Sequence, residues 1–152
     1  MNNKTETERW KRDAQDYLKE AERGFFENSF RSATQNAQLC IETSCKAVIS
    51  YFGEPEWTHS PGGQLLKIIE SKKEELKKLL PLGLFKDLYK LYEDADFAGP
   101  WQGLSAYGEV RGGIHYAAVD ICTKEIAQDL VKRARNTYKT LEEFWGCIIN
   151  RL

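Results

Sequence analysis

The sequence predicts an all-α fold in which several helices pack into one bundle. Three observations indicate this class. Apolar residues recur at spacings of three and four in successive segments, as the buried face of an α-helix requires. No segment alternates polar and apolar residues like a half-buried strand, and no alternation of strands with helices appears. Proline and glycine residues separate the periodic segments and mark the connections between helices.

The first helix is expected to begin near Thr5, because Thr5 and Glu8 have the spacing of a capping box. In such a box, the two side chains accept hydrogen bonds from backbone N–H groups that the first helical turn leaves exposed. Charged residues fill one face of this helix. The apolar face is a stripe made of Trp10, Ala14, Tyr17, Leu18, Ala21 and Phe25.

Asn28 and Ser29 interrupt the periodicity, since short polar side chains favour turns and helix starts over helix interiors. A second helix is predicted from Phe30. Small residues occupy the middle of its stripe, which allows a neighbouring helix to approach closely. Because the connection is short, the two helices are predicted to form an antiparallel hairpin. The stripe consists of Phe30, Ala33, Ala37, Cys40, Ile41, Ser44, Ala47, Val48 and Tyr51.

A loop rich in glycine and proline follows at residues 53–63 and carries Trp57 and His59. A third helix is then expected around residues 64–79. Pro81 and Gly83 end it, and a fourth, shorter helix is expected over roughly residues 84–93.

Gly99 and Pro100 end the region that contains the fourth helix, and an irregular segment is expected after them. The last helix is predicted to begin near Thr123, whose hydroxyl can cap its first turn. Spacings of three and four continue from there almost to the end of the sequence. This last stripe consists of Ile126, Leu130, Ala134, Tyr138, Leu141, Trp145 and Ile149.

Length, composition and charge limit the classes of function. The 152 residues fit one domain, residues 1–152, and a 41% apolar fraction is ordinary for a folded protein. A net charge of -1 gives no general attraction to nucleic acid or anionic membranes, so a phosphate-binding surface would be a local patch. The first residues resemble neither a secretory signal nor a transit peptide, and no transmembrane run occurs. We expect a soluble, cytoplasmic protein without membrane association.

The cysteines lack the Cys-x-x-Cys spacing that zinc and redox sites need. The two histidines form no cluster with them that has the spacing of a metal site. We therefore expect neither a structural metal nor a cofactor. Reduced and mostly buried thiols are predicted at Cys40, Cys45, Cys122 and Cys147.

A series of short motifs runs through nearly the whole chain. It comprises Trp10, Ala14, Tyr17, Leu18 and Ala21, then Ala33, Gln38, Glu42 and Lys46, then Gly53, Trp57-Thr58-His59-Ser60 and Leu65-Leu66, and finally Arg111. In this order the motifs resemble those of the HEPN family. The resemblance implies an up-and-down bundle of four to five helices that is often a homodimer. It also implies nucleotide binding, partnership with a minimal nucleotidyltransferase or metal-independent RNA cleavage, and it does not choose among these.

Arg111 and His115 are the candidate catalytic residues. RNA-cleaving members of the family carry an arginine, four to six further residues and then a histidine near the start of the last helix. Here only three residues intervene. A guanidinium can neutralise a scissile phosphate, and an imidazole can transfer the proton of a 2′-hydroxyl or of the leaving oxygen. In the alternative, structural interpretation Arg111 pairs with Glu109 or Asp120, and His115 caps or packs beside Tyr116.

Lys46, Trp57, His59 and Tyr107 are the candidate ligand-binding residues. Trp57 could stack on a base and His59 could donate to a phosphate, or Trp57 could cover the core while His59 caps the third helix. The first interpretation of Lys46 is a surface ion pair with Glu42, which would contribute little to stability. In the alternative, functional interpretation, the Lys46 side chain turns toward a ligand phosphate. Tyr107 either rims a ligand or covers the apolar end of the helical hairpin.

Three functional hypotheses follow from these residues and from the resemblance. The first is a nucleotide- or RNA-binding module that acts as a homodimer or as the partner of a minimal nucleotidyltransferase. The second is a toxin-like, metal-independent endoribonuclease that uses Arg111 and His115 across a dimer interface. The third is a structural interaction module without a ligand.

Overall fold

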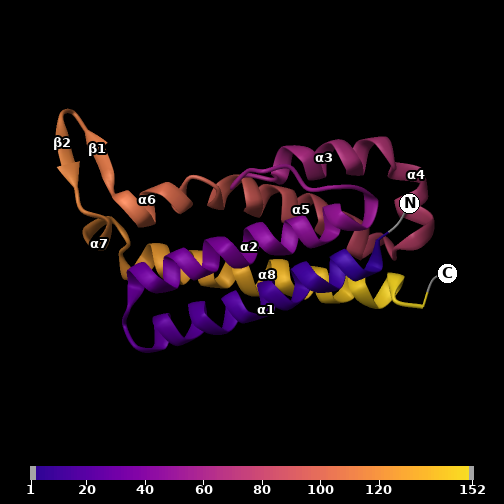
Figure 1. Cartoon of the computed structure of the whole chain (residues 1–152), viewed down its shortest axis with the longest axis horizontal. Coiled ribbons are helices and arrows are strands. Elements are labelled where there is room, and N and C mark those ends of the chain that lie inside the picture. Colours follow the sequence, from indigo (N-terminus) through magenta and orange to yellow (C-terminus); the bar gives the residue numbers. More distant parts are fainter. Residues whose placement is uncertain (1–2, 151–152) are drawn as a thin grey trace.

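The protein is a helical bundle with a two-stranded hairpin projecting from one end (Figure 1). The computed structural model describes residues 3–150, and the predicted all-α class is confirmed. Helices α1, Lys4–Phe26, and α2, Phe30–Phe52, form the predicted antiparallel pair. Asn28 turns the chain between them with a φ of 60°, a left-handed conformation that asparagine tolerates better than most residues.

The start of α1 differs from the expectation. Asn3 is the N-cap, and its side-chain oxygen accepts a hydrogen bond from the Glu6 backbone N–H at 3.0 Å. The predicted capping box of Thr5 and Glu8 is therefore wrong. Asparagine is at least as good a cap as threonine, so Asn3 starts the helix before Thr5 can cap it.

Helix α2 is the centre of the bundle. Helices α1, α8 and α5 pack around it, and every residue from Cys40 to Tyr51 is buried. The sequence predicted one apolar face, but a surrounded helix buries its polar residues as well. Gln38, Glu42 and Lys46 are consequently held among helices, where each polar atom needs a partner.

The expected third helix is two helices, α3 at Gly62–Ser71 and α4 at Lys73–Leu79. The break falls at Lys72, whose φ of -113° and ψ of 24° are not helical. Helix α5, Leu82–Ala98, extends beyond the predicted fourth helix at both ends and stops at Gly99. Residues 94–98 are therefore helical as well, and α3 packs on this helix.

The segment expected to be irregular is ordered. It comprises α6, Trp101–Tyr107, the antiparallel strands β1, Glu109–Arg111, and β2, Ile114–Tyr116, and the single turn α7, Ala118–Ile121. Gly112 and Gly113 form the two-residue turn, with φ angles of 54° and 79° that favour glycine. The strands are too short for a visible alternation of polar and apolar residues.

Helix α8, Lys124–Ile148, is the last helix and lies alongside α1 and α2 (Figure 1). Thr123 caps it as predicted, since its hydroxyl accepts a hydrogen bond from the Ile126 N–H at 3.3 Å. Asp94 of α5 is completely buried and receives hydrogen bonds from Lys90 at 2.8 Å and from Arg133 of α8 at 2.7 Å. The contact with Arg133 joins α5 to α8.

The core is one cluster of apolar side chains from α1, α2, α3, α4, α5 and α8. The prediction of free, mostly buried thiols is confirmed, because Cys40, Cys45 and Cys122 are buried and Cys147 is partly buried. Among residues 3–150, no helix combines the length and the apolar character needed to cross a membrane.

Candidate functional site

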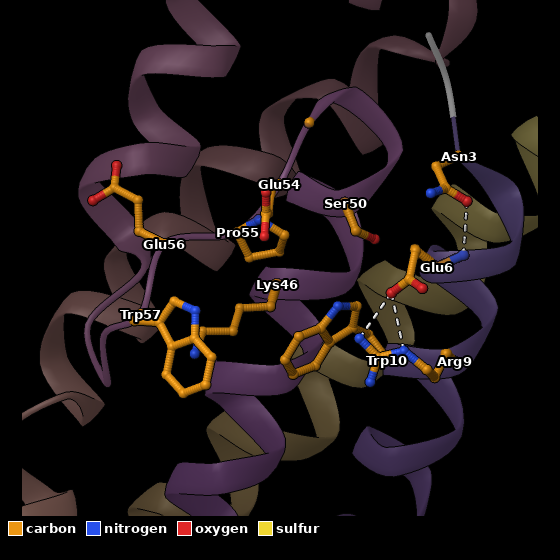
Figure 2. A pocket seen from close by; sticks show the side chains of 11 residues that line it. Asn3, Glu6, Arg9, Trp10, Lys46, Ser50, Glu54, Pro55, Glu56 and Trp57 are labelled. Carbon is orange, nitrogen blue, oxygen red and sulfur yellow. Dashed lines mark hydrogen bonds and ion pairs between the residues drawn. The ribbon is translucent and has the colours of Figure 1, made fainter.

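A pocket of about 630 Å³ lies where the start of α1 meets the end of α2 and the loop after it (Figure 2). This volume lies within the range of small-molecule sites. The residues around it come from two stretches that are distant in sequence, 3–10 and 46–57. They are Asn3, Glu6, Arg9, Trp10, Lys46, Ser50, Gly53, Glu54, Pro55, Glu56 and Trp57.

The antiparallel pairing of α1 and α2 assembles the pocket. It places the first turns of α1 beside the last turns of α2, and two polar contacts fix the register. The Asn3 N–H donates to the Tyr51 carbonyl oxygen at 3.2 Å, and the hydroxyls of Thr7 and Ser50 lie 3.3 Å apart. The pocket is thus a consequence of the helical hairpin.

Lys46 is the buried cation of the pocket, with a relative exposure of 7%. Its ammonium lies 3.1 Å from Oε2 of Glu42 and 5.6 Å from the centroid of the Trp10 ring. In the view of Figure 2, Lys46 lies between Trp10 and Trp57, and all three side chains line the pocket. An ammonium has three N–H donors, so Lys46 can also bind a ligand while it keeps its contact with Glu42.

Glu42 holds Lys46 and His59 together. Its Oε1 lies 2.9 Å from Nδ1 of His59 and accepts a hydrogen bond from Nε2 of Gln38 at 3.0 Å, while Oε2 faces Lys46. The expectation of a weak surface pair between Glu42 and Lys46 is wrong, because both side chains are buried. His59 does not cap α3 either, since Pro61 occupies the cap position without a side-chain hydrogen bond.

The two tryptophans differ in environment. Trp57 is 100% exposed, so the expectation that it covers the core is wrong. Trp10 packs partly against the core, and its buried Nε1 has no hydrogen-bond partner within residues 3–150. One wall of the pocket is therefore a fixed indole with an unused donor, and the other is an indole that the rest of the protein does not hold.

Charges around the pocket are mixed. The Arg9 guanidinium donates to Oε2 of Glu6 at 2.7 and 2.9 Å and lies 4.7 Å above the Trp10 ring. Glu54 and Glu56 are exposed at the rim. Their carboxylates oppose a highly charged anion, and they can accept hydrogen bonds from the amino groups of a base.

Arg111 lies in β1, on the hairpin at the other end of the bundle (Figure 1). It donates from Nε to Oε2 of Glu109 at 2.7 Å, and its guanidinium lies 5.2 Å from the centre of the Tyr116 ring. The hydrogen bond that Arg111 donates to Glu109 raises the Arg111 pKa above its usual value, and the negative charge of that carboxylate is the second cause. The alternative in which Arg111 pairs with Glu109 is confirmed.

His115 does not share a face with Arg111. Val110 is paired with His115 and Arg111 with Ile114, and successive side chains along a strand point to opposite faces. Nε2 of His115 lies 3.2 Å from the carbonyl oxygen of Tyr107, so this imidazole contacts its own chain. Within one molecule, the ribbon places the two side chains on opposite sides.

The remaining candidate, Tyr107, ends α6 and is 79% exposed. It lies next to the hairpin and does not line the pocket (Figure 1). The structure thus brings together Lys46, Trp57 and, through Glu42, His59. Arg111, His115 and Tyr107 belong to a separate surface.

Trp10 and Arg9 line the pocket but were not among the candidate ligand-binding residues. Trp10 was assigned to the apolar stripe, and it does pack partly against the core. The predicted antiparallel pairing of the first two helices could have identified them, because it places the first turns of α1 beside the end of α2 and hence beside Lys46.

A comparison with protein families finds a match. The model of the HEPN domain matches residues 7–144, nearly the whole chain, including the β-hairpin and every residue that lines the pocket except Asn3 and Glu6. The search of curated proteins gives no significant match to the chain, and the search of solved structures gives none.

Proposed function

The chain belongs to the HEPN domain family, and from this premise we propose that it binds a nucleotide, free or as an unpaired residue of RNA, in the pocket between α1 and α2. Membership of this family indicates a nucleotide- or RNA-related role. One observation supports this particular site: two indoles, Trp10 and Trp57, line the same pocket of about 630 Å³ as the buried Lys46, whose ammonium lies 5.6 Å from the centroid of the Trp10 ring.

The indoles supply the base-binding part of the site. Stacking of a base on an aromatic side chain contributes about 1–3 kcal/mol per base. Trp57 is fully exposed, so it can turn onto a base without breaking a contact in the core. The carboxylates of Glu54 and Glu56 at the rim offer several acceptors to the amino groups of the base or to the sugar hydroxyls.

Lys46 and Arg9 supply the cations for a phosphate. Both already have a carboxylate partner, Glu42 and Glu6 respectively, and Glu54 and Glu56 add negative charge at the rim. The site therefore suits one phosphate group better than a chain of phosphates. Most of the affinity should come from stacking, so it should fall only modestly as salt concentration rises.

Tryptophan fluorescence during titration with the four ribonucleoside monophosphates and a short single-stranded RNA tests this function. We expect quenching with at least one ligand, and a loss of about tenfold in affinity for Trp57→Ala, in line with one lost stacking contact. The thermal midpoint of Trp57→Ala should equal that of the wild type, because the side chain buries nothing.

Phe26→Ala is the matched control, since Phe26 is another exposed aromatic residue, 87% accessible, at the other end of α1. It should leave the affinity unchanged. If the wild type binds none of these ligands, nucleotide binding at this pocket is rejected. Equal affinities for Trp57→Ala and the wild type would reject the site while leaving the function.

The endoribonuclease hypothesis stays a prediction, as do the expected homodimer and the expected minimal nucleotidyltransferase partner. Cleavage by Arg111 and His115 would need the two side chains to reach one phosphate, and they lie on opposite faces of the hairpin. RNA left intact by the purified protein at stoichiometric concentration would remove that hypothesis. Nucleotide binding in the pocket between α1 and α2 needs neither a second copy of the chain nor a nucleotidyltransferase.

A further inference from the structure

The hairpin of β1 and β2 has an open edge. Within residues 3–150, β1 pairs with β2 alone, and the hairpin extends beyond the helices (Figure 1). Val110 and Ile114 are 65% and 58% exposed. A two-stranded hairpin is only marginally stable by itself in water, and an unpaired edge is a template for a further strand.

The register identifies which backbone groups face outward. In an antiparallel ladder, pairs that exchange hydrogen bonds alternate with pairs that do not. The pair that flanks a two-residue turn exchanges hydrogen bonds, and here it is Arg111 with Ile114. Val110 and His115 form the next pair, which exchanges no hydrogen bonds. The N–H and C=O groups of Val110 therefore face away from β2, toward the open edge.

The charges along this edge are self-complementary. Glu109 and Arg111 flank Val110, their side chains lie on one face of the ribbon, and they are 32% and 61% exposed. If two copies of β1 run antiparallel about a two-fold axis at Val110, Glu109 of each lies directly opposite Arg111 of the other. Opposite charges in that position stabilise strand pairing, and like charges destabilise it.

We propose that β1 pairs with β1 of a second copy of this chain, giving a four-stranded antiparallel sheet in the order β2-β1-β1-β2. The two Val110 residues exchange backbone hydrogen bonds at the axis, and two pairs of Glu109 with Arg111 cross it. Such an interface is isologous, with the same patch on both partners, as most homodimers have. This pairing is independent of the ligand pocket, which lies at the other end of the bundle.

The self-complementary charges favour a second copy over an unrelated strand. Any extended peptide could bond to the Val110 backbone, but a partner that also matches the charges needs an arginine or lysine opposite Glu109 and an acid opposite Arg111. The chain itself carries that sequence in the required orientation. Because each strand has three residues, the interface is small and the dimer should dissociate on dilution.

Charge reversal tests the pairing, with mass measured by sedimentation equilibrium over a range of concentrations. The wild type should be a concentration-dependent dimer. Glu109→Arg and Arg111→Glu should each be monomeric, since each places two pairs of like charges opposite one another. An equimolar mixture of these two variants should form a heterodimer, and the double variant Glu109→Arg/Arg111→Glu should again form a homodimer.

Val110→Pro provides a second, charge-independent test. It removes the outward N–H of β1 and leaves the bonds to β2, because proline is accepted at edge positions whose N–H faces solvent. This variant should be monomeric. A wild type that stays monomeric at every concentration overturns the pairing, as does a dimer that all these variants retain. The pairing is also overturned if Glu109→Arg and Arg111→Glu are each monomeric but do not associate when they are mixed.

Discussion

At the level of single residues, burial changes the meaning of the Glu42–Lys46 pair. A spacing of four on a helix is typical of surface ion pairs, which contribute little. Here the side-chain exposures are 7% and 9%, so the two charges have lost most of their water and depend on each other. Removal of one partner from such a pair leaves a buried charge, which costs far more than a surface pair contributes.

The free energy of unfolding should therefore respond unequally to three variants. Glu42→Met leaves Lys46 without its carboxylate, and we expect a loss of about 3–5 kcal/mol. Lys46→Met should cost less, because Glu42 keeps the hydrogen bond from Gln38 and the contact with His59. The double variant Glu42→Met/Lys46→Met should lose less free energy of unfolding than the two single variants lose in sum. Urea unfolding measures all three.

Glu20→Ala provides the control, since Glu20 pairs with Arg23 at the surface with side-chain exposures of 38% and 63%. It should change the free energy of unfolding by less than about 1 kcal/mol. Additive losses in the Glu42 and Lys46 variants would show that the two buried charges do not depend on each other.

The candidate site shows where reasoning from residue spacing is limited. Arg111 and His115 are four apart, and on a helix that spacing would put both on one face. The chain instead turns back at Gly112 and Gly113 and forms two strands. Side chains along a strand alternate between its two faces, so Arg111 and His115 lie on opposite faces of the hairpin. Lys46 and Trp57 were identified because their chemistry is visible in the sequence, whereas their partner Trp10 comes from a helix that only tertiary packing brings close.

At the level of the elements, two helix starts provide a matched comparison. The Thr123 hydroxyl caps α8, whereas Ser29 stands at the start of α2 without a side-chain hydrogen bond to that helix. Thr123→Ala should reduce the free energy of unfolding by about 1 kcal/mol, the usual contribution of a cap. Ser29→Ala should have little effect. Thermal or urea unfolding measures the difference, and equal losses would contradict the assignment of the two caps.

The long helices were predictable and the short elements were not. In α1, α2 and α8, apolar residues recur over many turns, so the periodicity of the sequence is sufficient to predict these helices. The strands have three residues each, and the break at Lys72 comes directly before a run of lysine, glutamate and leucine residues that favour helices. The pair Gly112-Gly113 is a known hairpin signal, and with Val110 and Ile114 beside it the hairpin could have been proposed.

At the scale of the whole molecule, the buried thiols make stability depend on pH. Burial raises the Cys40 pKa from 9.0 to about 12, and it also raises the pKa values of Cys45 and Cys122. In the unfolded chain these thiols ionise near pH 9, while in the native protein each of them ionises at a higher pH. The native state then binds more protons than the unfolded state, so raising the pH favours unfolding.

The free energy of unfolding should consequently fall as pH rises from about 9 to about 12, with a contribution from Cys40 of up to about 1.4 kcal/mol per pH unit. Cys40→Ser removes the ionisable group and should make this fall less steep. Urea unfolding across this pH range compares the two proteins. Equal slopes would mean that Cys40 does not remain protonated in the native protein.

The separation of the pocket from the hairpin would determine how a dimer of this kind binds RNA. Helix α2 connects the two ends, and its 23 residues span about 35 Å at 1.5 Å per residue. Pairing through β1 would therefore leave each pocket about one length of α2, roughly 35 Å, away from the paired strands. A single strand long enough to reach both pockets would bind twice, and the second event would be intramolecular. Dimerisation would then raise the avidity for long RNA while leaving the affinity for mononucleotides unchanged.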